Sequence, residues 1–200
     1  AAQLTLLFSY QSHVGLVFER IALLNGLFMT GLALGAGLGA RISAAGRPAV
    51  ALMLVLALVS LGMLAFPWAL ATLGSITPAA QETGYLALAA TLGLLTGTGF
   101  PLGADLAHRA RPEITTRGGV TAAADNLGGA LGGLSTGALL IPLLGIESTS
   151  QVLAALTLMV LVPLAFGRWA PDAWTAPGPR GLPSSLPWPR LRWGLLLAVL

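Results

Sequence analysis

The clearest residue for chemistry in this 200-residue sequence is a carboxylate inside an apolar stretch. Asp125, followed by Asn126, lies in the run RGGVTAAADNLGGALGGLSTGALLIPLLG (residues 117–145), which is long and apolar enough to cross a bilayer. An ionisable side chain at the centre of a span costs about 2.5–3.5 kcal/mol on insertion scales, so such groups usually face protein or water. Asp125 and Asn126 therefore form the candidate intramembrane polar site.

Two interpretations of Asp125 remain open. In the first, the carboxylate takes up and releases a proton, or binds a cation, and couples that event to transport. In the second, it forms a structural hydrogen bond or ion pair, for instance with Arg117, which lies about two helical turns earlier in the chain.

A second candidate feature is the pair Phe100 and Pro101, which we expect to kink or break its helix. Proline lacks the backbone donor that a helix interior needs, and an interrupted membrane helix can expose carbonyls that line a site. Nearby, Asp105 and Arg109 have the spacing of a helical ion pair. His108 is expected to be a solvated residue at the membrane interface.

No enzyme motif is found in the sequence. The glycines lie inside apolar segments and follow no strand, so they do not form a nucleotide loop. Cysteine is absent, which excludes disulfides and Cys-ligated metal, and the two histidines are too far apart in sequence to give metal-ligand spacing. We therefore expect no catalytic residue, no metal and no cofactor.

Composition indicates that lipid surrounds much of this chain. Hydrophobic residues make up 56% of the sequence and charged residues 8%, whereas soluble domains carry roughly 25% charged residues. Mean hydropathy is +0.84. All ten basic residues are arginines, and they do not cluster among aromatic residues, so nucleic acid is not an expected partner.

The elements that would position these residues are membrane-spanning helices. Lipid tolerates no open sheet edges, and no strand-like alternation is present, so we expect an all-α, polytopic transmembrane bundle. Residues 1–167 form this bundle, residues 168–190 a Pro- and Trp-rich cytoplasmic linker, and residues 191–200 the start of a further, truncated span. The five full spans are expected at about 21–42, 49–70, 84–106, 117–145 and 149–167, with residues 71–83 as a loop and residues 1–13 as the end of a preceding helix or an interfacial segment.

Glycines at four-residue spacing predict how these helices pack. Such spacing places the glycines on one face of a helix, where the missing side chains let a second helix approach closely. The predicted packing glycines are Gly31, Gly35 and Gly39 in the first span and Gly129, Gly133 and Gly137 in the Asp125 helix, with Gly128 and Gly132 on an adjoining stripe.

Orientation follows from the arginines. The segments after the first, third and fifth predicted spans carry arginine, and those after the second and fourth carry none. By the positive-inside rule, the Arg-bearing loops and the Pro-rich linker lie in the cytoplasm, in a bacterial-type inner membrane. Arg20 falls on the outer side and is an exception.

Three pieces of the sequence carry a resemblance to a known family: FSYQSHVGLVFERIALLNGLFMTGLALGAGLGAR (8–41), TGTGFPLGADLA (96–107) and GGVTAAADNLGGALGGLSTGALLIPLLGI (118–146). In this order they resemble the membrane region of the spermidine-synthase-like multi-pass membrane proteins, the fused major-facilitator and spermidine synthase type. The resemblance covers most of residues 8–167. In that family the membrane region is usually joined to a soluble aminopropyltransferase-like domain. No βαβ pattern is present here, so synthase activity is not carried over.

The expected function is therefore that of a non-catalytic integral membrane protein that anchors or scaffolds a larger complex. Its expected partners are the lipid bilayer and other membrane subunits, or parts of the same chain outside this sequence, which opens and closes inside apolar runs. The alternative is a transporter-like bundle that moves a small solute, with Asp125 as the coupling residue. The first is favoured because a solute path usually shows several polar side chains within spans, and here Asp125 and Asn126 are nearly alone.

Overall fold

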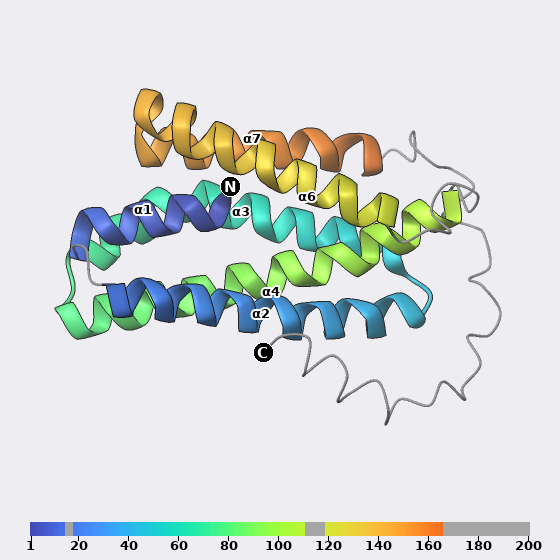
Figure 1. Ribbon diagram of the computed structural model, residues 1–200, viewed down its shortest axis with the longest axis horizontal. Coiled ribbons are helices and arrows are strands. Elements are labelled where there is room, and N and C mark those ends of the chain that lie inside the picture. Colours follow the sequence, from blue (N-terminus) through green and yellow to red (C-terminus); the bar gives the residue numbers. More distant parts are fainter. Residues whose placement is uncertain (15–17, 111–118, 166–200) are drawn as a thin grey trace.

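The computed structural model describes residues 1–14, 18–110 and 119–165, and these residues form helices joined by short turns, with no strand among them. In Figure 1 the long helices lie side by side, with their axes roughly along the longest dimension of the molecule. In chain order the elements are α1 (Ala2–Val14), α2 (Phe18–Ala44), α3 (Pro48–Gly74), α4 (Pro78–Ala110), α6 (Gly119–Leu134), the π-helical segment η1 (Ser135–Leu140) and α7 (Ile141–Ala165).

Four helical segments are long and apolar enough to cross a membrane. They are Phe18–Ala44, Pro48–Gly74, Pro78–Arg109 and Ala122–Val162, with mean hydropathies of 1.8, 2.7, 1.4 and 1.7. Large apolar side chains point outward from them: Leu34 is 64% exposed, Leu61 63% and Met159 74%. Helix length, hydropathy and this outward apolar surface indicate a multi-pass integral membrane protein.

The turns between helices are shorter than the sequence suggested. α2 ends at Ala44 and is followed by Gly46, whose φ of 88° suits a glycine just past a helix end. Pro48 opens α3, where proline is tolerated in the first turn. The expected loop at 71–83 is wrong in extent, because α3 runs to Gly74 and α4 begins at Pro78. Pro78 therefore opens a helix and is not a loop residue.

The predicted kink or break at Phe100 and Pro101 is not a break, and a kink there stays a prediction. α4 continues without interruption from Pro78 to Ala110, with Pro101 inside it. Membrane helices tolerate an internal proline because the surrounding protein and local backbone adjustments satisfy the freed carbonyl. The ring of Pro101 lies against α2 at Gly39, where a Cβ would be 2.6 Å from Pro101 Cγ.

The hydrophobic core occupies the half of the bundle that contains α1. Leu6 and Tyr10 of α1 are 1% exposed and pack with a cluster of buried residues from α2, α3, α4 and α7. α1 is thus a packed helix of 13 residues, about 20 Å long and too short to span a bilayer. Gln3 Nε2 donates to Asn25 Oδ1 at 2.7 Å and ties α1 to α2.

The chain reverses direction inside the α7 segment. Gly145 has φ 78° and ψ 173°, which is not helical and which favours glycine. Figure 1 shows the orange ribbon turning back at this end of the bundle and running beside α3. Thr149 Oγ1 donates to the carbonyl of Gly145 at 2.6 Å, so the returning helix starts immediately. This turn coincides with the boundary expected between residues 145 and 149.

Candidate intramembrane site around Asp125

The floor of the candidate site is the seam between α2 and α4, whose backbones touch. A Cβ built on Gly31 would lie 2.5 Å from the carbonyl oxygen of Ala90, and one on Gly35 would overlap the carbonyl of Leu94. The contact is reciprocal, because a Cβ on Gly93 or Gly97 of α4 would overlap a carbonyl oxygen of α2. Only residues without a side chain permit this approach.

Polar contacts hold the same two helices together at both ends. At one end, Arg20 of α2 forms an ion pair with Glu82 of α4. At the other, Asp105 Oδ2 accepts from Arg109 Nη2 at 2.9 Å and from Ser43 Oγ of α2 at 2.6 Å. The ion pair between Asp105 and Arg109 confirms the spacing argument. The contribution of Ser43 was not visible from the sequence, because it depends on how α2 and α4 are aligned.

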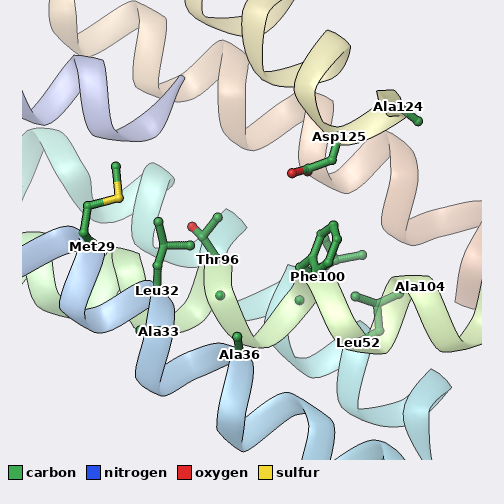
Figure 2. A pocket seen from close by; sticks show the side chains of 14 residues that line it. Met29, Leu32, Ala33, Ala36, Leu52, Thr96, Phe100, Ala104, Ala124 and Asp125 are labelled. Atoms are coloured by element: carbon green, nitrogen blue, oxygen red, sulfur yellow. The ribbon is translucent and has the colours of Figure 1, made fainter. Parts of the chain in front are cut away.

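A cavity of about 760 Å³ lies above this seam, between α2, α3, α4 and α6. Its walls are almost entirely apolar or glycine, and Asp125 is the one charged residue among those that line it. In Figure 2 the carboxylate of Asp125 points from α6 into the space above Phe100 and Thr96, whereas Ala124 points away. The lining residues are Met29, Leu32, Ala33, Ala36, Leu52, Leu56, Thr96, Gly97, Gly99, Phe100, Gly103, Ala104, Ala124 and Asp125.

The structure therefore brings together two predicted site residues, Asp125 and Phe100, from α6 and α4. Phe100 is 44% exposed and forms part of the cavity wall. Asn126 is exposed and makes no hydrogen bond through its side chain within the described part of the chain. Arg117, the suggested partner of Asp125, lies outside the described residues, and Asp125 forms no ion pair among the residues that are described.

The glycines of α6 and η1 have different surroundings from those of α2. Among the described residues, no atom lies within 4 Å of a Cβ built on Gly128, Gly129 or Gly132. For Gly133 and Gly137 the nearest is Leu4 Cδ1, at 3.7 and 3.9 Å. These are ordinary van der Waals distances to one side chain, and no helix backbone approaches α6 here. α6 packs only weakly on the other described helices.

Sequence reasoning missed the cavity face of α2. Met29, Ala33 and Ala36 follow the spacing of one helix face, which lies about a third of a turn around α2 from the glycine face. The small alanines at two of these positions were the available signal. They leave room that leucine would fill, but small residues in a lipid-exposed helix do not by themselves show which side is hollow.

Comparison of the chain with protein-family models, curated proteins and solved structures gives no match. The fold and the cavity thus define a class, a multi-pass helical membrane protein with a carboxylate beside an apolar cavity. The resemblance to the spermidine-synthase-like membrane proteins stays a prediction.

Proposed function

We propose that this protein is a non-catalytic membrane subunit that anchors or scaffolds a larger membrane complex, and that α6 is the helix its partner covers. The observation that carries the proposal is the bare face of α6. A Cβ placed on Gly128, Gly129 or Gly132 would have no neighbouring atom within 4 Å in the described part of the chain. The same spacing on α2 is filled by the backbone of α4.

The physical argument rests on what drives helix association in lipid. Apolar side chains gain little by leaving lipid for protein, so helices associate through close backbone packing and polar contacts between helices. α6 offers both, since its glycine face lies next to Asp125 and Asn126, which are exposed. An exposed carboxylate in hydrocarbon is costly, and a partner helix that covers it and supplies a donor removes that cost.

The proposal includes five spans. The segment Ala122–Val162 has 41 residues and would be about 60 Å long if straight, roughly twice the hydrocarbon thickness. The reversal at Gly145 divides it into two passes of suitable length. α2, α3, α4 and these two passes make up the five.

The proposal also includes an orientation. One end of the bundle carries Arg41, Arg47 and Arg109, and the opposite end carries Glu19, Glu82 and Glu147 with Arg20. The positive-inside rule places the arginine-bearing end in the cytoplasm.

The test uses the absence of cysteine from the sequence. A single cysteine replaces Gly132 on α6, or Gly37 on α2 as a matched control, because Gly37 also has no atom within 4 Å of its Cβ position. In native membranes, a benzophenone maleimide attached to the cysteine and activated by light should crosslink the Gly132→Cys variant to a second transmembrane chain and leave the Gly37→Cys variant uncrosslinked. Purification of the wild-type chain as a partner-free monomer in mild detergent would contradict the proposal.

A second candidate function is a transporter-like bundle that moves a small solute, with Asp125 as the coupling residue. The cavity of about 760 Å³ and the carboxylate that points into it favour this candidate. The chain in proteoliposomes with an imposed pH gradient would be screened with a panel of small organic cations, and a pH-sensitive dye would report proton flux. Asp125→Asn should abolish any coupled flux and Asn126→Ala should leave it. Flux that survives Asp125→Asn removes this candidate.

A further inference from the structure

A second cavity, of about 800 Å³, lies at the opposite end of the bundle from Arg41, Arg47 and Arg109. It is bounded by His13 near the end of α1, by Leu70 to Ser75 at the end of α3, and by residues 144–148 around the Gly145 turn. Its volume is in the range of sites that hold small molecules. Unlike the Asp125 cavity, its lining combines several polar side chains with apolar ones.

The tautomer of His13 can be inferred from its neighbours. Nδ1 lies 2.9 Å from the carbonyl oxygen of Ser9, and a carbonyl only accepts hydrogen bonds, so Nδ1 carries the hydrogen. Tyr85 Oη is 3.3 Å from the same nitrogen and 2.9 Å from Ser9 Oγ. Ser9 and Tyr85 are fully buried, so this network holds the imidazole ring in place.

It follows that neutral His13 presents the lone pair of Nε2 as a hydrogen-bond acceptor. Within the described residues, Nε2 has no hydrogen-bond partner. Glu147, which lines the same cavity, is exposed, and its carboxylate forms no ion pair in the described part of the chain. Ser75 Oγ donates its hydrogen to the carbonyl of Thr72 at 2.8 Å, so toward a ligand it also acts as an acceptor.

The charge at this end favours a cation. Glu19, Glu82 and Glu147 lie at this end with Arg20, and Arg20 is already paired with Glu82. The other wall, around the end of α3, contributes no charged residue to the cavity. A cleft with one sign of charge raises the local concentration of ions of opposite sign.

We propose that this cavity is a binding site for a small primary ammonium cation, held by the Glu147 carboxylate and by Nε2 of His13. A protonated primary amine supplies what the cavity lacks, a positive charge and several N–H donors. The apolar part of the ligand packs on Leu70 and Ile146, which line the same space. This site is separate from the Asp125 cavity and does not depend on the scaffolding proposal.

The test measures binding of radiolabelled n-butylamine to the full chain in phosphatidylcholine nanodiscs at mildly alkaline pH. Under these conditions the amine is protonated. Two further probes separate the requirements: n-butanol has a donor without charge, and tetramethylammonium has charge without a donor. The proposal expects n-butylamine to bind at least about tenfold more tightly than either, since hydrogen bonds to charged groups are the stronger ones. Equal binding of all three would overturn it.

Variants identify the site. Glu147→Gln removes the charge, and His13→Asn keeps a donor near the Nδ1 position while removing the Nε2 acceptor. Each should weaken n-butylamine binding by about tenfold or more. Glu19→Gln, at the same end of the bundle but outside the cavity lining, should leave the affinity unchanged. Wild-type affinity in both site variants, with the folded state verified by their melting temperatures, would refute the assignment.

A lipid headgroup can also carry a primary ammonium group, so a separate measurement tests whether the ligand is a lipid. The measurement is repeated in nanodiscs that contain phosphatidylethanolamine. A weaker apparent affinity for n-butylamine there shows that the headgroup competes for the site, and an unchanged affinity shows that the site takes a water-borne amine. Both results support ammonium recognition.

Discussion

α2 and α6 both carry glycines four residues apart, yet their surroundings are opposite. On α2 the glycines lie against the carbonyls of α4, so closely that any side chain would overlap them. On α6, a Cβ built on Gly128, Gly129 or Gly132 would meet no atom of the described residues within 4 Å. The spacing of glycines therefore shows that a helix can be approached, but not which helix approaches it.

The comparison also separates two kinds of cost. At the α2–α4 seam a substitution acts on the folded chain itself, because the atom in the way is backbone and cannot rotate aside. On α6 a substitution has nothing to strike within the described residues, and its effect would appear only in association with a partner. Substitutions at the α2–α4 seam should thus lower the free energy of unfolding of the chain, whereas substitutions on α6 should weaken its association with a partner.

The largest effect is expected at the seam. Gly35→Leu should lower the free energy of unfolding by about 3 kcal/mol or prevent folding, because its Cβ would overlap the Leu94 carbonyl. Denaturation in detergent micelles, followed by circular dichroism, measures this. Gly37→Leu, on the open side of the same helix, is the control and should unfold as the wild type does. Equal stability of the two variants would show that the seam is looser than described.

A smaller effect is expected at the end of the seam. Asp105→Asn should lower the free energy of unfolding by about 1–3 kcal/mol, because the carboxylate accepts hydrogen bonds from both Ser43 and Arg109, and the Arg109 side chain is only 9% exposed. The same denaturation assay measures it. Ser43→Ala, which removes only the link to α2, should account for part of this loss. No loss in either variant would mean that the glycine contacts alone hold this end.

The ion pair at the opposite end should contribute less. Arg20 is 47% exposed and Glu82 23%, and exposed pairs are typically worth about 0–1 kcal/mol. Arg20→Gln is therefore expected to cost less than about 1 kcal/mol, and the cost should shrink as salt is added. A cost as large as that of Asp105→Asn would contradict the difference in exposure between the two ends.

The smallest effect on stability is expected on α6. The double variant Gly128→Leu with Gly132→Leu should change the free energy of unfolding of the isolated chain by less than about 0.5 kcal/mol. The same double variant should no longer co-purify with a partner chain from native membranes in mild detergent. Strong destabilisation of the isolated chain would show instead that α6 packs within its own bundle.

The long apolar segments could be predicted from the sequence because hydropathy alone determines where a backbone can lie in lipid. α2 and α3 extend beyond the expected ranges 21–42 and 49–70 by one to four residues at each end. The additional residues at these helix ends are mostly polar or small, and such residues are compatible with either a helix or a turn. The composition of residues 71–83 suggested a loop, but α3 continues to Gly74 and α4 begins at Pro78, so most of these residues are helical.

The candidate site could be predicted only in part. Asp125 was evident because a carboxylate in an apolar run is rare. The cavity was not evident, because it depends on how far α6 lies from α2 and α4, which no local pattern encodes. The cavity around His13 and Glu147 combines residues more than 130 positions apart, and only the tertiary arrangement shows that they line one space.

The double attachment of α2 to α4 has a consequence for motion. An ion pair between Arg20 and Glu82 joins the two helices at one end. The Ser43–Asp105 hydrogen bond joins them 23 residues farther along α4, and their backbones touch in between. We therefore expect α2 and α4 to behave as one rigid helix pair. In a conformational change of this protein, α2 and α4 should keep their positions relative to each other. We expect α6, η1 and the turn at Gly145 to move instead. The distance between a spin label on α6 and one on α4 would report this movement.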